Sequence, residues 1–196
     1  MERVNIMIGR FQPFTKGHYS CIRAAKNIKN LPTVICMINV SPTKVDKRHP
    51  FPSEMLSDLY SELFKNNEDI AEVVSIKSAD IVYIANMLRS YGYEIASWTC
   101  GSDRFDEYSR MARKYHELAG LSSDFEVIEV KRTDDDISAT KARMCLLNDD
   151  REGFLSMIPD GSYRNELYDI LKRQIDRVYK FESLDRRLRF LERYFL

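Results

Sequence analysis

Short hydrophobic runs alternate along the chain with segments in which hydrophobic residues recur every three or four positions. The runs predict β-strands, and the spaced hydrophobic positions predict helices. Strands are expected over residues 4–8, 34–40, 73–76, 94–99 and 125–130. Helices are expected over 17–29, after 53 and 80, over 103–119 and from about 138. Ser53 and Asp80 are expected to be N-caps, because their side chains can accept a hydrogen bond from the first helical turn.

Five repeats of strand and helix predict an α/β fold, a Rossmann-like doubly wound sheet of five parallel strands with helices on both faces. In such a sheet, ligands bind beyond the carboxyl ends of the strands, at the point where the strand order reverses. The loops that follow the first, fourth and fifth strands are therefore expected to share one crevice.

Residues 162–196 lack glycine and proline and carry hydrophobic residues at helical spacing. We predict two helices here, with a break near Glu182 and Ser183, and divide the chain into a Rossmann-like domain (1–158) and a C-terminal helical extension (159–196). An amphipathic extension of this kind packs against the sheet domain or, as the alternative, forms a homo-oligomer contact.

Composition narrows the function classes. Lysine plus arginine and aspartate plus glutamate both number 30, so the formal net charge is zero and argues against a nucleic-acid partner. The sequence has neither an apolar run of membrane-helix length nor the basic and apolar segments of a signal peptide at its start. The 4 cysteines lack CxxC spacing, which favours buried thiols in a reducing, cytoplasmic compartment. His49, His116 and the run Asp134–Asp136 lack metal-ligand spacing, so we expect no protein metal site.

The loop from Gly9 to His18 joins the first predicted strand to the first predicted helix, a place suited to binding phosphate. A helix N-terminus exposes backbone N–H groups and the positive end of the helix dipole. Gly9 and Gly17 allow a ligand to approach the backbone closely. Thr15 offers a hydroxyl, His18 an imidazole N–H, and Arg10 a planar fork of donors.

This loop, GRFQPFTKGH, resembles the (H/T)xGH motif of the nucleotidylyltransferase superfamily. Thr15, Gly17 and His18 match the threonine version of the motif. The preceding GRFQPF is similar to the nicotinamide-mononucleotide adenylyltransferase branch, from which the chain departs at Thr15, where that branch has histidine. The resemblance implies that Phe11 and Gln12 belong to the ATP site together with the flanking residues. We refer to residues 9–18 as the first motif.

Residues 137–143, ISATKAR, resemble the superfamily's second motif, ISSTxxR, at the start of a helix. Ile137, Ser138, Thr140 and Arg143 match, and Ala139 replaces a serine. A serine N-cap and exposed amides can bind phosphate, and an arginine one turn later can fold back over the same anion. The resemblance implies that this second motif holds the β- and γ-phosphates of ATP.

Two further segments match more weakly. After the fourth strand, Gly101, Asp103 and Arg104 fall where the superfamily lines the nucleotide; Asp103 serves as an N-cap or a ligand, and Arg104 binds phosphate or faces solvent. Trp98 stacks on a ring of the substrate or, as the alternative, lies in the core, and the same choice applies to Phe11.

The loop over residues 41–51, which we call the basic loop, carries three cations. Superfamily members often place one such residue against the triphosphate, and we select Lys47, with Lys44 and Arg48 as the alternatives.

Taken together, the resemblance implies an adenylyltransferase. A phosphate monoester would attack the α-phosphorus of ATP in line, with His18, Thr15 and Arg143 as catalytic residues and Mg²⁺ bound through substrate phosphates. Nicotinamide mononucleotide is the expected acceptor. Phosphopantetheine or flavin mononucleotide as acceptor, CTP as donor, and a non-catalytic nucleotide-binding module remain alternatives.

Overall fold

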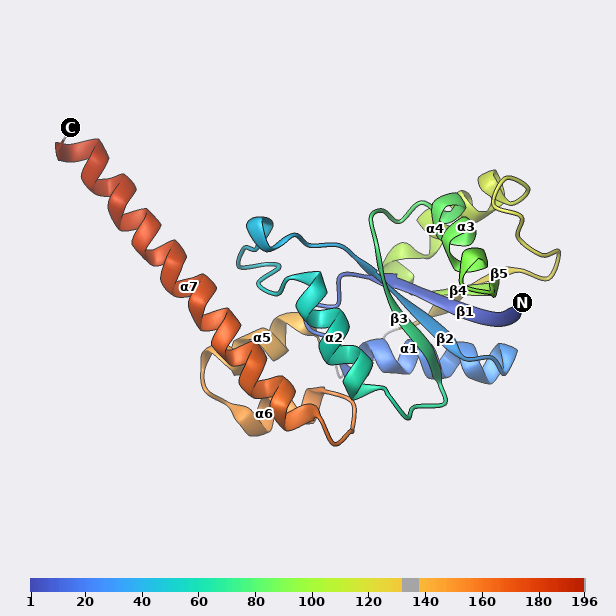
Figure 1. Ribbon diagram of the computed structural model, residues 1–196, viewed down its shortest axis with the longest axis horizontal. Coiled ribbons are helices and arrows are strands. Elements are labelled where there is room, and N and C mark those ends of the chain that lie inside the picture. Colours follow the sequence, from blue (N-terminus) through green and yellow to red (C-terminus); the bar gives the residue numbers. More distant parts are fainter. Residues whose placement is uncertain (132–137, 196) are drawn as a thin grey trace.

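A computed structural model describes the backbone of residues 1–131 and 138–195, and their side chains except at 42 and 181–195 (Figure 1). It confirms the predicted α/β class. The strands are β1 (Glu2–Gly9), β2 (Thr33–Ile38), β3 (Ile70–Ile76), β4 (Tyr93–Gly101) and β5 (Glu126–Val130). They form one sheet in the order β3-β2-β1-β4-β5, and every neighbouring pair is parallel. The order reverses between β1 and β4, which places the expected crevice at their carboxyl ends.

Seven α-helices and one 3₁₀ turn lie within the described residues. They are α1 (Lys16–Lys29), η1 (Pro42–Lys44), α2 (Ser53–Leu63), α3 (Ile81–Ser90), α4 (Ser102–Tyr115), α5 (Ala139–Leu147), α6 (Arg151–Met157) and α7 (Arg164–Phe195). Helix α6 was not anticipated from the sequence. Asp80 is confirmed as an N-cap, since its carboxylate accepts a hydrogen bond from the backbone N–H of Tyr83 at 2.9 Å.

The prediction that Ser53 is an N-cap is wrong. The N-cap position of α2 is Pro52, and Ser53 is the first helical residue. The buried hydroxyl of Ser53 accepts a hydrogen bond from Val40 N at 2.5 Å and donates to Ile38 O at 3.1 Å. The hydroxyl of Ser53 thus connects α2 to the end of β2. The strand ends at Ile38 and not at residue 40 as predicted, and Val40 N binds Ser53 instead of a neighbouring strand.

Side chains of the sheet alternate between two hydrophobic clusters, one on each face. Along β1, Met7 points into one cluster, whereas Ile6 and Ile8 point into the other. The first cluster contains residues of α1, α2, α5, α6 and α7, and the second contains residues of α3 and α4. Helices therefore cover both faces, as in a doubly wound sheet (Figure 1).

The predicted break near Glu182 and Ser183 is also wrong, because α7 runs as one helix over 32 residues. Neither residue is a strong helix breaker, so nothing in this segment interrupts the backbone hydrogen bonding. Leu167, Leu171 and Ile175 of α7 are fully buried in the first cluster. The C-terminal end of α7 extends away from the sheet (Figure 1).

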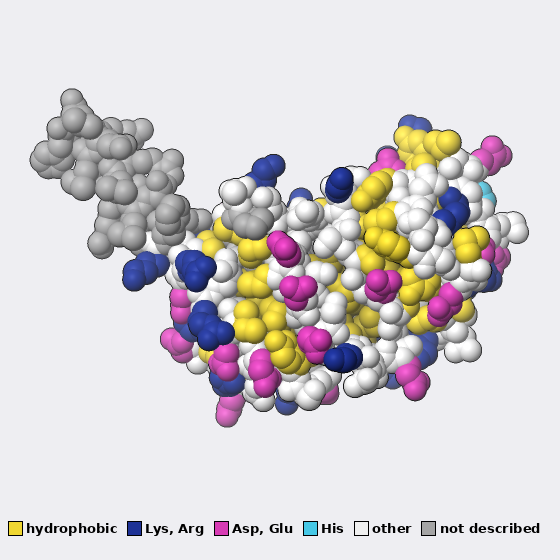
Figure 2. Space-filling model, viewed as in Figure 1, with side chains coloured by type: hydrophobic (Ala, Val, Ile, Leu, Met, Phe, Trp, Pro, Cys, Tyr) yellow, Lys and Arg dark blue, Asp and Glu magenta, His cyan; other side chains and the backbone are white. Residues whose placement is uncertain are grey.

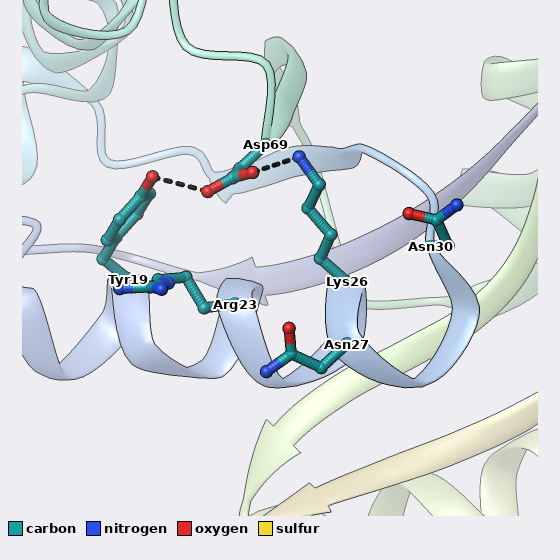
Figure 3. A pocket seen from close by; sticks show the side chains of 6 residues that line it. All are labelled: Tyr19, Arg23, Lys26, Asn27, Asn30 and Asp69. Carbon is teal, nitrogen blue, oxygen red and sulfur yellow. Dashed lines mark hydrogen bonds and ion pairs between the residues drawn. The ribbon is translucent and has the colours of Figure 1, made fainter.

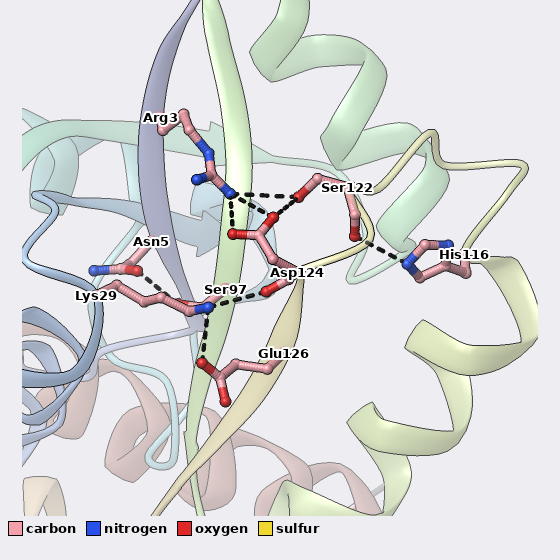
Figure 4. Close-up of polar contacts among 8 residues, drawn as sticks. All are labelled: Arg3, Asn5, Lys29, Ser97, His116, Ser122, Asp124 and Glu126. Atoms are coloured by element: carbon pink, nitrogen blue, oxygen red, sulfur yellow. Dashed lines mark hydrogen bonds and ion pairs between the residues drawn. The ribbon is translucent and has the colours of Figure 1, made fainter.

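Ion pairs stabilise the end of the sheet at which the strands begin (Figure 4). The guanidinium of Arg3 contacts the carboxylate of Asp124 at 2.8 Å, and the ammonium of Lys29 contacts Glu126 at 2.8 Å. These contacts join β1 and the end of α1 to β5 and the loop before it. This end of the sheet is opposite to the carboxyl ends of the strands.

Acidic and basic side chains are intermingled on the face of the molecule shown in Figure 2. Of the helices in the described part of the chain, none combines the length and apolar character needed to cross a bilayer.

Candidate active site

A cavity of about 580 Å³ opens at the carboxyl ends of the central strands. Its walls come from the end of β1 and the first motif, the end of β2, the basic loop, α4 and α5. The lining residues are Ile8, Gly9, Arg10, Gln12, Ile38, Arg48, His49, Arg104, Tyr108, Thr140 and Arg143. The cavity therefore lies where the strand order predicts a ligand site, and it brings together segments of both sequence motifs.

The cavity is lined by cations. Arg10, Arg48, Arg104 and Arg143 contribute guanidinium groups, and among the described residues no aspartate or glutamate lines it. Arg104 is partly compensated by Glu107, whose carboxylate lies 2.8 Å from its Nη1. A wall with this charge favours a polyanion such as a triphosphate, because arginine forks match phosphate oxygens in geometry and charge.

The first motif folds with Phe11 turned inward. Phe11 is 4% exposed and has a backbone φ of 47°, and its ring packs edge-on against the imidazole of His18 with centroids 5.2 Å apart. A Cβ atom on Gly9 would lie 2.9 Å from this ring, so glycine leaves the space that Phe11 fills. Phe11 thus packs beneath the loop against His18 and does not line the cavity. Trp98 is fully buried too, so the structure places both aromatic residues in the core.

Tyr60 of α2 holds the same loop by its hydroxyl group. Its buried O–H donates to Phe11 O at 2.8 Å and accepts from Phe14 N at 2.7 Å. This role of Tyr60 was not anticipated from the sequence. A tyrosine in a stripe of aliphatic residues was the available signal, since a buried hydroxyl needs partners.

Thr15 and His18 form the start of α1. The backbone N–H of Thr15 donates to Nδ1 of His18 at 3.0 Å, and Thr15 Oγ1 lies 3.1 Å from the same nitrogen. Because Nδ1 acts as an acceptor, the neutral imidazole carries its proton on Nε2, which makes Nε2 the donor. Thr15 is 1% exposed and faces His18, and His18 is half-buried. Neither residue lines the cavity, although both belong to the first motif, whose Gly9, Arg10 and Gln12 do; His18 packs against Phe11, and Gly17 is exposed.

Arg143 connects the second motif to the first. Its Nη1 donates to the backbone carbonyl of Gln12 at 2.5 Å, and its Nη2 donates to Thr140 Oγ1 at 3.1 Å. Burial lowers the pKa of Arg143, yet a guanidinium remains charged near neutral pH. Ser138 is the N-cap of α5, accepting a hydrogen bond from Lys141 N at 3.1 Å. Ile137 lies outside the described residues.

Gln12 links the first motif to the basic loop. Its buried side-chain amide donates to Phe51 O at 2.7 Å and accepts from Phe51 N at 3.0 Å. Only its backbone and the edge of its side chain can therefore meet a ligand.

The basic loop turns Arg48 and His49 toward the cavity. The carboxylate of Asp46 accepts hydrogen bonds from the backbone N–H groups of Arg48 at 2.8 Å and His49 at 2.7 Å. The ammonium of Lys47 instead lies 5.0 Å from the ring centre of Tyr179 on α7. Of the three cations considered, Arg48 is the one that lines the cavity; Lys44 is exposed. The position of His49 in the cavity wall was not anticipated, because the sequence does not show which way each side chain of a loop points.

The segment after β4 contributes one wall. Gly101 occupies the N-cap position of α4 and Asp103 lies within the first turn, so the N-cap alternative for Asp103 is wrong; Arg104 lines the cavity. Tyr108 also lines it and stacks on the buried Trp98 with ring centroids 3.9 Å apart. Tyr108 is thus the aromatic residue that reaches the cavity, with Trp98 beneath it.

A second hollow lies over the exposed face of α1 (Figure 3). Here the carboxylate of Asp69 accepts a hydrogen bond from Tyr19 at 2.7 Å and pairs with Lys26. Two cations, Arg23 and Lys26, and one carboxylate line this hollow, so its positive surplus is smaller than that of the cavity at the strand ends, which four arginines line. Within the described ranges no three histidine, cysteine, aspartate or glutamate side chains gather to hold a metal ion.

Three solved structures resemble this one. A bifunctional NMN adenylyltransferase/ADP-ribose pyrophosphatase from Francisella tularensis, complexed with AMP and a Mn ion, is 22% identical over 100% of this chain and 57% of its own, with a TM-score of 0.54. TmcAL of Thermotoga maritima, bound with alpha-thio ATP, is 12% identical over 89% and 57%, with a TM-score of 0.55. A Plasmodium falciparum nicotinic acid mononucleotide adenylyltransferase with NaAD is 13% identical over 94% and 98%, with a TM-score of 0.50.

These likenesses show a shared fold, and this chain spans 57% of the length of the first two proteins. No curated protein matches the sequence. A comparison with protein families matches residues 6–144, which include the first motif and the second motif through Arg143, to the cytidylyltransferase-like family. The chain therefore belongs to the cytidylyltransferase-like family, within the nucleotidyltransferase superfamily.

Proposed function

We propose that the chain is an adenylyltransferase that transfers AMP from ATP to nicotinamide mononucleotide, giving NAD and pyrophosphate. The observation that carries this proposal is the hydrogen bond from Arg143 to Gln12 O. It joins the two superfamily motifs, 131 residues apart, beside one cationic cavity. The adenylyltransferases among the similar structures, one with AMP and one with NaAD, support the same chemistry.

In the proposed reaction, a phosphate oxygen of the acceptor forms a bond to the α-phosphorus of ATP. The bond from that phosphorus to the bridging oxygen breaks, and pyrophosphate leaves with the electron pair. Such a transfer depends mainly on positioning and charge neutralisation, so it needs no covalent intermediate on the protein.

The side chains of the site suit these tasks. His18 would donate its Nε2 proton as a hydrogen bond to a phosphoryl oxygen at the reacting centre. Arg143, Arg48 and Arg10 would neutralise the charge that develops on the departing pyrophosphate. The N-termini of α1 and α5 add backbone N–H groups and positive dipole ends, with the hydroxyl of Thr140 beside them.

Mg²⁺ is proposed as the cofactor. Because no carboxylate lines the described cavity walls, the ion would be held by phosphate oxygens and water rather than by side chains. When bound in this way, it neutralises phosphate charge. The protein's own contribution remains the arginine-lined wall.

The test is release of pyrophosphate by the purified full chain, with ATP or CTP as donor. The acceptors are nicotinamide mononucleotide, nicotinic acid mononucleotide, flavin mononucleotide and phosphopantetheine. We expect release with ATP and nicotinamide mononucleotide, together with stoichiometric NAD. Release with another acceptor or with CTP would refute the substrate assignment, and release with none would favour a non-catalytic nucleotide-binding module.

The control is Arg113→Ala, which removes an exposed arginine of α4 whose Nε donates to Ser109 O at 3.2 Å, in its own helix. It should retain wild-type turnover, because Arg113 does not line the cavity.

A further inference from the structure

His49 lies in the cavity wall, and the groups that face its two ring nitrogens suit a neutral imidazole. Its Nε2 lies 3.4 Å from Arg10 Nη1, and its Nδ1 lies 3.4 Å from an oxygen of Asp46. An arginine N–H can only donate, so Nε2 faces it as an acceptor and the imidazole proton is on Nδ1, toward the carboxylate. The ring is half-buried among these groups.

The charges around His49 come from three elements. Arg10 belongs to the first motif, Arg143 to α5, and Asp46 to the same loop as His49. Burial, Arg10 and Arg143 lower the pKa of His49, whereas Asp46 raises it, and the net shift is downward. Arg48 and Arg104 line the same cavity and add to its positive charge.

A polyphosphate chain bound in this cavity would raise the pKa of His49. Its oxygens would engage the guanidinium of Arg10 and replace a positive neighbour of His49 with negative charge. Nε2 would then face acceptor oxygens with a lone pair, an unfavourable contact that a proton from solvent converts into a hydrogen bond. Nδ1 keeps its proton toward Asp46 in both states.

We infer that His49 is a polyphosphate-binding residue that takes up one proton as the triphosphate enters the cavity, so that nucleotide binding is coupled to proton uptake. The inference rests on the proposed function only in assigning a triphosphate to this cavity.

The other histidines do not share this arrangement. The chain has 3 histidines. Nδ1 of His18 already accepts a hydrogen bond from the backbone of Thr15. The ring of His116 contacts Ser122 O at 3.1 Å near the opposite edge of the sheet (Figure 4), which makes His116→Gln a matched control.

The experiment is calorimetric titration of the full chain with inorganic triphosphate, and separately with ATP, in buffers of different ionisation enthalpy near pH 7. For the wild type and His116→Gln, we expect the observed enthalpy to depend on the buffer in the sense of proton uptake. For His49→Gln, we expect the net proton uptake to be lower than that of the wild type, by up to one proton, and the affinity to fall. Because the protonated form binds more tightly, the ratio of wild-type affinity to that of His49→Gln should fall as pH rises, by up to about tenfold per pH unit; titration of the ligand's phosphates is common to both proteins and cancels in this ratio.

Equal proton uptake by His49→Gln, no uptake by the wild type, or no binding of either ligand would each overturn the inference. As a second measurement, the NMR signal of the His49 ring in the wild type should move toward its protonated position when triphosphate is added, and an unmoved signal refutes the inference without a variant. Inorganic triphosphate requires no acceptor and no turnover. Proton-coupled binding without pyrophosphate release would therefore refute the adenylyltransferase and leave the role of His49 intact.

Discussion

Replacing Arg143 by lysine keeps a positive charge in the cavity while removing the fork that joins the two motifs. In the wild type, one guanidinium donates both to Gln12 O at 2.5 Å and to Thr140 Oγ1 at 3.1 Å. A lysine ammonium is a single point on a flexible stem, so it cannot hold both partners and face a phosphate. The substitution therefore separates the effect of geometry from the effect of charge.

The expected magnitudes follow from these contacts. A hydrogen bond from a charged donor contributes about 1.5–3 kcal/mol to stability, and the half-buried position of Arg143 favours the lower end. We expect Arg143→Lys to reduce the free energy of unfolding by about 1–2 kcal/mol. Loss of a preorganised donor at a reacting centre typically lowers turnover by ~10²–10³. We expect about 10² for Arg143→Lys and at least 10²–10³ for Arg143→Ala.

The assay combines pyrophosphate release at saturating ATP with urea unfolding of the same preparations, and Arg113→Ala is the control. Native folding with a large loss of turnover in both Arg143 variants would support the assignment. Turnover near wild type in Arg143→Ala, with the variant folded, would refute the catalytic role of this guanidinium. Full activity in the lysine variant would instead show that charge suffices and that the bond to Gln12 is dispensable.

Three further substitutions probe other contacts. His18→Ala should lower pyrophosphate release by at least ~10² with little change in thermal unfolding, and near-normal turnover would exclude His18 from the reacting centre. Tyr60→Phe leaves two buried main-chain groups of the first motif without their partner, so it should cost about 1–3 kcal/mol in urea unfolding; an unchanged midpoint would contradict this. Hydrogen bonding by Arg3 lowers the pKa of Asp124 to about 2, below the value of about 4 in an unfolded chain. The ion pair therefore stabilises the fold above about pH 4 and is lost as pH falls toward 2. Asp124→Asn should be less stable than wild type at pH 7, and the difference should shrink as pH falls through 2; a difference independent of pH would rule out the ion pair as its source.

Much of the fold was predictable because the hydrophobic pattern is a local property. Alternating hydrophobic runs and spaced positions predicted the five-stranded parallel sheet, and the strand order explains why the two motifs meet at one edge. The N-caps at Asp80 and Ser138 were likewise predictable, since their partners lie three residues away. Ser53 has the same residue type as a cap, yet its partners belong to β2 and the loop after it, so sequence spacing gave the wrong role.

The candidate site was less predictable where the direction of a side chain decides its role. Lys47 and Arg48 are adjacent cations, and the turn organised by Asp46 determines that Arg48 lines the cavity while Lys47 lies against Tyr179. Phe11 stands in the middle of the first motif but turns inward, because Gly9 leaves room for its ring. Both outcomes depend on contacts that residue type alone does not specify.

The contacts of Gln12 show why a short motif can specify a whole site. Its side-chain amide binds the backbone of Phe51 in both directions, and its own carbonyl accepts the guanidinium of Arg143. One residue thus fixes the first motif against the basic loop and against α5, so the walls of the cavity are positioned before any ligand binds. Electrostatic stabilisation of a transition state requires such preorganisation, because groups that must first move lose part of their effect. Gln12 therefore contributes by holding other residues in place. Two of its three hydrogen bonds involve main-chain atoms of Phe51. Any residue other than proline has both of these groups, an N–H and a C=O, at position 51. The residue type at 51 therefore could not predict these hydrogen bonds.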